Sequence, residues 1–342
     1  MGSCAPPPRV IAHRGASGYH VEHTLAAYTL AVAMGAHAIE PDLVSTRDGV
    51  LVVRHDVEIS ATTDVGSRPE FADRATTKMV DGHESTGWFT DDFDLAELTT
   101  LRAVERLPAL RGHPDPPAEE SGVLTFAQVL ALREWLCEKY ERPVGIVPEI
   151  KHPTYFRRRG VDQARAVIEL LDRYGLAVAS APVALQCFEL GTLLRLREEL
   201  GYRGELMFLT TATGAPYDLV LAGEPTRYAD LTSRAGLERL AAAGIDGIGP
   251  DKDQVIPRRP DGRLGAPTSL VQDAHAAGLS VTPWTFRNEN AFLPLDYRVG
   301  PDPAGHGRAA AEVLAYLHVG VDGFFTDHPD TGVAAREAVR AG

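Results

Sequence analysis

Two histidines and several carboxylates stand at the ends of short apolar runs, where they could move a proton or hold a cation. His13 and His55 each end such a run, and Glu40 and Asp42 lie together in another. Short runs rich in β-branched residues are typical of strands. Because barrel enzymes build active sites from polar groups at strand ends, these residues are candidates for an active site.

The carboxylates have the spacing of a site for a hard metal ion. Glu40 and Asp42 are two residues apart on one expected strand, so both side chains project to the same face. Glu149 ends another expected strand. Carboxylates held this close repel each other unless a cation lies between them or one is protonated. Three carboxylates without a nearby cysteine suit Ca²⁺ or Mg²⁺. The alternative is a salt-bridge network with Arg14 and Lys151.

The histidines have the chemistry of a general acid and base. An unperturbed histidine pKa of about 6.5 suits proton transfer near neutral pH. Arg14, beside His13, and Lys151, beyond Glu149, offer the cations that a phosphate group would need. The alternative is that both histidines are hydrogen-bonded structural residues.

Strand-like and helix-like segments alternate over almost the whole chain. Thr24 is the expected N-cap of a helix over 24–34, and Thr125 with Gln128 forms an expected capping box. Further helices are predicted at 162–173, 190–199, 233–243, 268–277, 308–317 and after Pro329, and further strands at 143–150, 183–186, 205–209, 247–248, 280–284 and 323–326. About eight successive β/α units favour a closed parallel barrel over an open sheet. The expected fold class is α/β, a TIM (β/α)8 barrel over residues 9–342.

Residues 58–123 break this alternation, and we call them the inserted segment. The stretch is rich in Thr, Asp, Gly, Pro and Glu, which is typical of a functional loop or an inserted subdomain. Trp88, Phe89 and Phe93 indicate packed aromatic side chains. Because the stretch follows a strand, as the irregular segments 251–267 and 285–307 do, we expect it to cap the catalytic face. The proline-rich lead, residues 1–8, is expected to be unstructured.

The bulk composition excludes several classes of partner. The 342 residues carry a formal net charge of −13, which argues against nucleic acid because a basic surface supplies most of that affinity. No apolar stretch is long enough to cross a bilayer, so stable membrane insertion is not expected. The cysteines form no CxxC pair and no disulfide framework. The lead lacks the hydrophobic region of a signal peptide. The protein is cytoplasmic if Met1 is the native start, and secreted or periplasmic if an export signal was removed; the oligomeric state is left open.

Short motifs follow one another from His13 to Asp330: His13-Arg14-Gly15, Glu22-His23-Thr24, Glu40-Pro41-Asp42, Asp48-Gly49-Val50, His55-Asp56, Glu149-Ile150-Lys151, Thr282-Pro283-Trp284-Thr285 and Gly320-Val321-Asp322-Gly323-Phe324-Phe325-Thr326-Asp327. Together they resemble the glycerophosphodiester phosphodiesterase family. The stretch 60–88 resembles the insertion of a subgroup exemplified by bacterial exported enzymes. Val21 and His23 depart from the proline and asparagine of many members, and His152 is a less usual residue after Lys151.

The resemblance implies a barrel that hydrolyses glycerophosphodiesters, such as glycerophosphocholine or glycerophosphoethanolamine, to sn-glycerol 3-phosphate and an alcohol. It implies one divalent cation, Ca²⁺ or Mg²⁺, on Glu40, Asp42 and Glu149. His13 and His55 would be the general acid and base, and Arg14 and Lys151 would bind the phosphate. The remaining expected substrate contacts are Trp284 against the glycerol carbons, with Phe188 and Gln186 at the pocket wall. Asp327 is expected to be a helix cap or turn residue.

Three other functions compete with this one. A related barrel phosphodiesterase could act on lysophospholipids or sphingomyelin through a cyclic phosphate. A catalytically silent binding protein could retain the barrel, although neither histidine nor any of the three carboxylates is missing. A metal-dependent amide hydrolase would normally have a His-x-His pair, which this sequence lacks.

Overall fold

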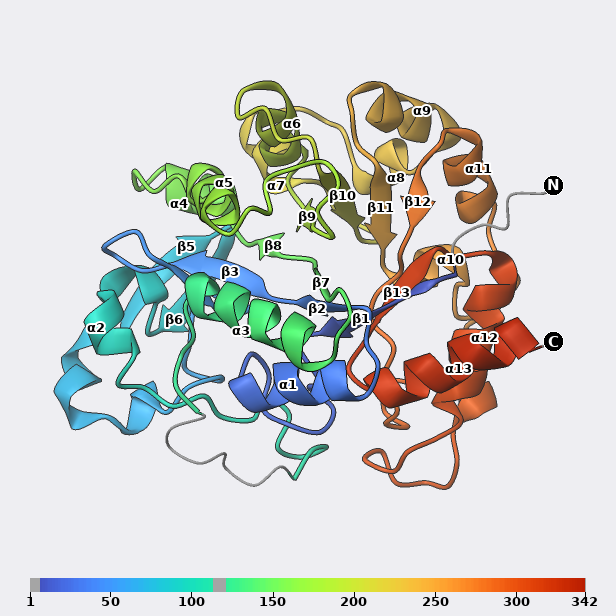
Figure 1. Cartoon of the computed structure of the whole chain (residues 1–342), viewed down its shortest axis with the longest axis horizontal. Coiled ribbons are helices and arrows are strands. Elements are labelled where there is room, and N and C mark those ends of the chain that lie inside the picture. Colours follow the sequence, from blue (N-terminus) through green and yellow to red (C-terminus); the bar gives the residue numbers. More distant parts are fainter. Residues whose placement is uncertain (1–6, 113–120, 342) are drawn as a thin grey trace.

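The computed structural model describes residues 7–112 and 121–341, and in these ranges parallel strands surround a common axis (Figure 1). The barrel strands follow the chain as β1 (Arg9–His13), β2 and β3 (Ala38–Glu40 and Asp42–Ser45), β7 and β8 (Gly145–Ile146 and Glu149–Ile150), β9 (Ala184–Cys187), β10 (Glu205–Thr210), β11 (Gly247–Pro250), β12 (Ser280–Val281) and β13 (Gly323–Thr326). β13 pairs in parallel with β1, and backbone hydrogen bonds such as Asp322 N to Val281 O (2.9 Å) join the last two strands. The sheet therefore closes, and the predicted TIM barrel is confirmed.

Prolines interrupt two barrel strands beside the predicted site. Pro41 separates β2 from β3, and Pro148 lies just before β8. Proline has no N–H group to donate to the neighbouring strand, so the hydrogen-bond ladder breaks there. Glu40, Asp42 and Glu149 are the residues that flank these breaks. The carboxylates thus lie beside two interruptions of the barrel wall.

Helices cover the outside of the barrel. They are α1 (Leu25–Ala33), α3 (Phe126–Lys139), α4 (Pro153–Arg157), α5 (Gln163–Arg173), α6 (Leu190–Glu198), α7 (Tyr217–Leu221), α8 (Tyr228–Leu231), α9 (Arg234–Ala242), α10 (Lys252–Val255), α11 (Leu270–Ala276), α12 (Ala309–Val319) and α13 (Pro329–Ala341). Thr24 caps α1, and Thr125 with Gln128 forms the predicted capping box of α3. The short helices α4, α7, α8 and α10 were not predicted. Among the helices of the described ranges, none combines the length and hydrophobicity needed to cross a lipid bilayer.

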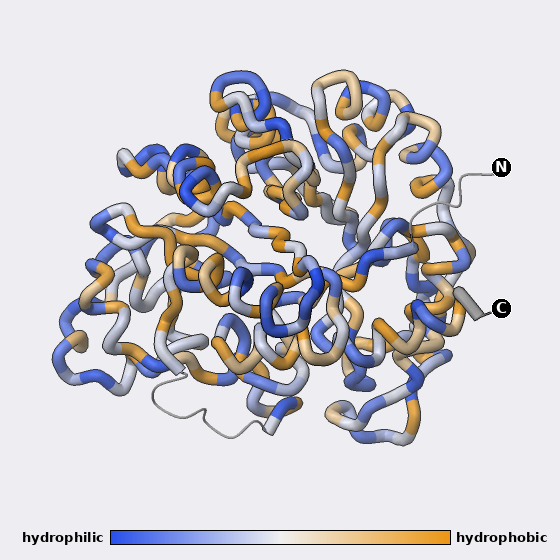
Figure 2. Tube along the Cα trace, in the orientation of Figure 1, coloured by the Kyte–Doolittle hydropathy of each residue, from blue (hydrophilic) through white to orange (hydrophobic). Residues whose placement is uncertain are grey.

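Two apolar layers hold the barrel together. The larger lies between the strands and the surrounding helices and includes Val10, Ile39, Phe208 and Phe324, all fully buried. A smaller cluster fills the barrel interior, with Ile11, Met207 and Phe325 among its members. Figure 2 shows the corresponding hydrophobic stretches along the strands. Close packing of this kind gives the strand ends fixed positions.

The run that ends at His55 is not a barrel strand. β4 (Leu51–Val53) pairs antiparallel with β3, with Leu43 opposite Val53. β3 pairs in parallel with β8 in the barrel wall; the chain then turns at residues 46–50 and returns on β4 along the other edge of β3. Arg54 N then donates to Asp42 O at 3.1 Å. His55 therefore reaches the level of the carboxylates from the outside, which corrects the expectation of a strand end in the barrel.

The inserted segment packs beside the barrel and contains its own secondary structure (Figure 1). Its elements are η1 (Val65–Ser67), η2 (Pro69–Arg74), β5 (Thr76–Val80), β6 (His83–Gly87), η3 (Thr90–Asp92) and α2 (Leu95–Leu98); a further 3₁₀ turn, η4 (Leu295–Tyr297), lies in the loop after β12. Phe89 and Phe93 are fully buried, and Phe93 packs edge-on against Phe71, so the predicted aromatic packing is confirmed. Residues 1–6 of the expected unstructured lead and residues 113–120 of the inserted segment lie outside the described residues.

Candidate active site

A cavity of about 130 Å³ opens at the carboxyl ends of the barrel strands and gathers the predicted residues. Its lining includes His13, Arg14, Glu40, His55, Glu149, Lys151, Gln186, Phe188 and Trp284, together with Leu209, Thr285, Arg287 and Phe325. Asp42, the remaining predicted residue, lies behind this lining, and its Oδ2 is 3.1 Å from Arg14 Nε. Residues from distant parts of the chain thus meet at one place.

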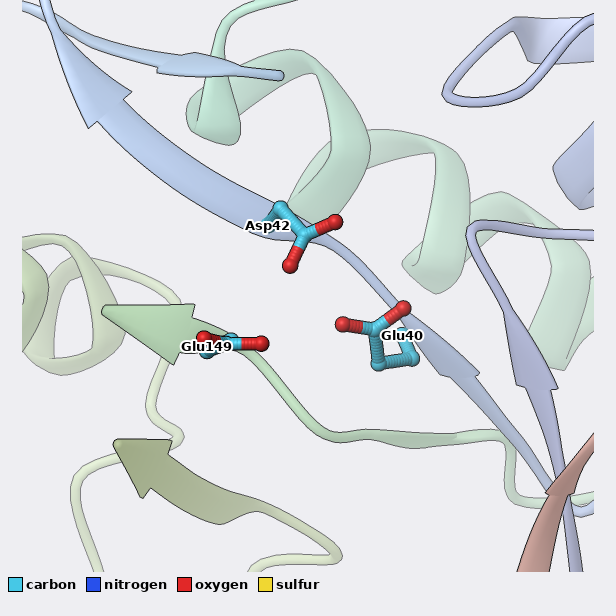
Figure 3. Close-up of side chains that lie close together, drawn as sticks. All are labelled: Glu40, Asp42 and Glu149. Atoms are coloured by element: carbon cyan, nitrogen blue, oxygen red, sulfur yellow. The ribbon is translucent and has the colours of Figure 1, made fainter. Parts of the chain in front are cut away.

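The three predicted ligand carboxylates point toward one another (Figure 3). One oxygen from each of Glu40, Asp42 and Glu149 lies within 4.8 Å of the others, and all three residues are buried. Burial and the neighbouring charge of Asp42 raise the pKa of Glu40 well above its usual value. Burial likewise raises the pKa of Glu149 to about 7. Such crowding of buried carboxylates is relieved when a cation binds among them, so this donor set fits a hard divalent ion.

Two cations border the carboxylates. Lys151 Nζ lies 2.8 Å from Glu149 Oε1 and 3.9 Å from Asp42 Oδ1. Arg14 adopts a left-handed backbone conformation (φ 59°), and its backbone N–H donates to Glu40 Oε2 at 2.8 Å. Although burial opposes it, the charges of Lys151 and Arg14 hold the pKa of Asp42 well below its usual range. Arg14 and Lys151 therefore orient the carboxylates and bring positive charge to the cavity wall.

His13 is held by a carboxylate on the neighbouring strand. Its Nδ1 lies 2.6 Å from Asp327 Oδ1, directly after β13. Asp327 Oδ2 accepts from Arg111 Nη2 at 2.6 Å and from Arg287 Nε at 2.7 Å. With Nδ1 engaged, Nε2 is the nitrogen left for a substrate. Asp327 lies in the bend between β13 and α13, as a turn residue would, and its side chain in addition orients a candidate catalytic residue.

His55 has a matching partner from its own segment. Its Nδ1 lies 2.7 Å from Asp56 Oδ1, and Asp56 Oδ2 accepts from Arg106 Nη1 at 2.7 Å. Arg106 Nη2 also donates to Glu22 Oε1 at 2.8 Å. On the other side, Lys151 Nζ lies 3.2 Å from His55 Nε2. The second histidine is thus fixed at both ring nitrogens.

Both imidazoles are kept neutral. Burial, assisted by the charge of Arg14, lowers the pKa of His13 to about 4 and that of His55 to about 3. Asp327 and Asp56 act in the opposite direction but do not overcome burial. At neutral pH each ring is therefore set to accept a proton, and the negative charge of a bound phosphate would raise both pKa values.

The three remaining predicted residues differ in position. Trp284 lines the cavity and donates from Nε1 to Gly249 O at 2.8 Å. Phe188 packs edge-on against Trp284 with the ring centres 5.8 Å apart. Gln186 is buried, and its Nε2 lies 3.3 Å from Glu40 Oε1. Trp284 and Phe188 thus form an apolar wall, whereas Gln186 supports a candidate metal ligand.

The prediction from sequence missed the residues that position these groups. His23 is fully buried and lies between Asp42 Oδ2 (3.0 Å) and the Tyr28 hydroxyl (2.7 Å). Arg106 and Arg111 come from the inserted segment, 50 or more residues away from the carboxylates they bind. Asp56 and Asp327 directly follow expected strands, which was the available signal for them. Nothing in the spacing of the two arginines indicated their partners.

The barrel, its carboxylate cluster and the paired histidines define an enzyme whose site is suited to a phosphate ester. The model of the glycerophosphoryl diester phosphodiesterase family matches residues 13–331. This chain therefore belongs to that family and is a phosphoric diester hydrolase. Glycerophosphodiester phosphodiesterase GDPD6 of Arabidopsis thaliana is 35% identical over 94% of this chain and 83% of its own length. A glycerophosphodiester phosphodiesterase of Haemophilus influenzae is 29% identical over 97% of this chain and 90% of its own length.

Solved structures share the fold. A putative glycerophosphoryl diester phosphodiesterase from Silicibacter pomeroyi aligns over 99% of this chain and 95% of its own, with a TM-score of 0.67 and 21% identity. A phosphodiesterase from Oleispira antarctica, solved with the product sn-glycerol-3-phosphate, aligns over 97% of each chain, with a TM-score of 0.62 and 20% identity.

Proposed function

We propose that this protein hydrolyses glycerophosphodiesters, such as glycerophosphocholine or glycerophosphoethanolamine, to sn-glycerol 3-phosphate and an alcohol with the aid of one divalent cation. The observation that carries the proposal is a pair of histidines, each with Nδ1 on a carboxylate, beside a cluster of three buried carboxylates. Family membership supports the reaction class. The product-bound relative from Oleispira antarctica supports the glycerol phosphate half of the substrate.

Glu40, Asp42 and Glu149 would hold Ca²⁺ or Mg²⁺. When bound, the ion would neutralise charge on the phosphate. Arg14 and Lys151 would bind the remaining phosphate oxygens, because both are buried cations at the cavity wall. Their existing ion pairs with Glu22 and Glu149 keep them in place when no substrate is bound.

His13 and His55 would exchange the protons of the reaction at Nε2. Asp327 and Asp56 hold the Nδ1 atoms, which fixes the ring orientation and favours the tautomer that leaves the lone pair on Nε2. Before a substrate binds, Lys151 Nζ lies at this position in His55. One ring would take the proton of the nucleophile, and the other would deliver a proton to the departing alkoxide. The nucleophile is water or the adjacent glycerol hydroxyl, and both routes need the same pair of histidines.

The apolar wall would receive the glycerol half of the substrate. Trp284 presents an indole ring to the cavity, with Phe188 against it, and aliphatic carbons pack well on such rings. We propose that the barrel over residues 9–342 is one domain, and that the inserted segment caps its catalytic face. The contacts of Arg106 and Arg111 with Asp56 and Asp327 support this role of the inserted segment.

The test is release of sn-glycerol 3-phosphate from glycerophosphocholine and glycerophosphoethanolamine by the purified chain. Parallel reactions contain a strong chelator, the chelator with excess Ca²⁺, and the chelator with excess Mg²⁺. We expect no release with chelator alone and restored release with at least one ion. Full activity in the chelator would contradict the metal assignment. No release in any reaction, or accumulation of a cyclic phosphate from a lysophospholipid, would contradict the proposed substrate.

A further inference from the structure

A second and larger cavity lies directly beside the catalytic one. Its volume is about 490 Å³, and it shares Glu149, Lys151 and Phe188 with the catalytic cavity. We call it the side chamber. Because a diester has two alcohol groups on one phosphate, a substrate whose glycerol lies against Trp284 must direct its other alcohol away from that wall. The side chamber is the adjoining space on the side of Lys151 and Phe188.

The β5–β6 hairpin of the inserted segment forms one side of the side chamber. The tip of the β5–β6 hairpin, Asp81-Gly82, has positive φ angles of 47° and 81°, as a tight two-residue turn requires. The His152 ring lies 2.5 Å from Asp81 Oδ2, which fixes this tip to the loop after β8. A Cβ added at Gly82 would lie 3.6 Å from the ring of Tyr217. The hairpin tip therefore touches the opposite side of the chamber.

Aromatic rings and carboxylates line the side chamber together. Phe188, Tyr217 and Tyr228 contribute rings, and Tyr228 packs edge-on against Phe188. Asp81 and Glu189 contribute carboxylates. Aromatic faces combined with carboxylates are the surroundings that bind ammonium groups. Lys151 at the boundary is paired with Glu149, so its charge is already balanced on the catalytic side.

Among the described residues, neither Asp81 nor Glu189 is paired with a lysine or an arginine, and the partner of Asp81 is the His152 ring. Asp81 Oδ1 is shielded from solvent and has no hydrogen-bond partner among the described residues. Glu189 is 3% exposed and is hydrogen-bonded to Thr154. Burial, together with the nearby charge of Asp81, raises the pKa of Glu189 to about 8. A cation placed between the two would stabilise both ionised groups.

We infer that the side chamber is the subsite for the departing alcohol and that it selects alcohols bearing a positive charge, such as choline or ethanolamine. The inference rests on the proposed function and names the substrate class of the same site. Because Lys151 Nζ already lies over the Phe188 ring, 5.7 Å from its centre, trimethylammonium or ammonium would lie against the rings of Tyr217 and Tyr228, with Asp81 and Glu189 supplying the opposite charge. Neutral and anionic alcohols would bind there less well.

The experiment compares two substrates that differ only in charge. One is glycerophosphocholine, and the other carries 3,3-dimethylbutanol, in which a carbon replaces the quaternary nitrogen. Both release sn-glycerol 3-phosphate, so one assay serves for both. We expect wild-type kcat/KM to favour glycerophosphocholine about tenfold. In an Asp81→Asn, Glu189→Gln double variant the preference should fall below about threefold, through loss of glycerophosphocholine turnover. Both amides keep the shape of the replaced groups and can keep the hydrogen bonds to His152 and Thr154.

Glu84→Gln is the matched control, because it removes one carboxylate from an exposed position on the same hairpin. It should retain the wild-type preference. A second measurement needs no variant: choline should inhibit the wild-type enzyme more strongly than 3,3-dimethylbutanol does. Equal kcat/KM for the two substrates, or equal inhibition by the two alcohols, would overturn the inference while leaving phosphodiester hydrolysis intact. Hydrolysis of neither substrate would instead contradict the proposed function.

Discussion

His13 and His55 face one cavity but are held there by different parts of the molecule. His13 ends a barrel strand, and its partner Asp327 follows the adjacent barrel strand. His55 follows an antiparallel strand outside the barrel, and its partner Asp56 is the next residue. The side chains of His13 and Asp327 are nearly enclosed, at 13% and 2% exposed. Those of His55 and Asp56 are 29% and 38% exposed.

Both histidine–carboxylate pairs are bound by an arginine of the inserted segment. Arg111 binds Asp327 in the first, and Arg106 binds Asp56 in the second. Arg111 is buried and also binds Glu289 and the Ser17 carbonyl. Arg106 is partly exposed and shares Glu22 with Arg14. The comparison indicates that the inserted segment positions both histidines, and that it holds His13 more rigidly than His55.

Replacement of either histidine should have the largest effect. We expect His13→Ala and His55→Ala each to lower kcat about 10³-fold, because each removes one proton-transfer group. Steady-state release of sn-glycerol 3-phosphate measures this. His318→Ala, at an exposed position on α12, is the control and should keep full activity. Near-normal turnover in one of the two variants, with the melting temperature unchanged, would remove that histidine from the mechanism.

The arginines should differ in a way that reflects their burial. Arg111→Met should lower kcat about 100-fold and Arg106→Met about tenfold, as expected when a group that orients a catalytic residue is lost. Arg111→Met leaves Glu289 buried without its cation and should lower the free energy of unfolding by about 3 kcal/mol. Arg106→Met should cost about 1 kcal/mol, since Asp56 remains hydrated and Glu22 keeps its ion pair with Arg14. Enzyme kinetics and urea denaturation measure the two effects.

Arg74→Met provides the control for both arginines. Arg74 belongs to the inserted segment but pairs with Glu97 on its surface, so kcat should stay within twofold of wild type. Arg111→Lys keeps the charge and should recover part of the stability. If Arg106→Met proved more damaging to kcat than Arg111→Met, the inferred difference in rigidity would be wrong.

The sequence carried enough information for the barrel and for most of the predicted side chains that line the candidate site. Alternating apolar runs and helix caps at Thr24 and Thr125 are local signals, and the structure has both caps where they were expected. His13, Glu40 and Glu149 were found because barrel geometry brings strand ends together. Local chemistry and fold geometry were sufficient for these residues.

The residues that support the site could not be found in this way. Arg111 and Asp327 are separated by 216 residues, and their contact depends on how the inserted segment packs on the barrel. The β5–β6 hairpin did carry a local signal, Asp81-Gly82, but the surrounding polar residues hid its alternation. His55 was assigned to a barrel strand because apolar runs of parallel and antiparallel strands look alike over three residues.

The pH dependence of kcat should distinguish the two histidines, because kcat reports the substrate complex, in which the charge of the phosphate raises both pKa values. Each imidazolium is stabilised by its carboxylate, so Asp327→Asn should lower the pKa of His13 and Asp56→Asn that of His55. The acidic limb of the profile reports the base and the alkaline limb the acid. We therefore expect each variant to shift a different limb to lower pH. The variant that moves the acidic limb identifies the base. Movement of the same limb by both variants would contradict separate roles.

Salt should produce the smallest difference between the two arrangements. Ion pairs at exposed positions are screened by salt, whereas buried pairs are much less affected. The loss of free energy of unfolding caused by Arg106→Met should therefore be smaller in 0.5 M NaCl than at low salt. We expect the difference to be about a few tenths of a kcal/mol, which is the size of the contribution of an exposed ion pair. The cost of Arg111→Met should stay constant, because Asp327 and Glu289 are inaccessible to ions. Urea denaturation at both salt concentrations measures each cost against wild type. Equal salt sensitivity would mean that Arg111 is more hydrated than its burial indicates, and that the two histidines are held in the same way.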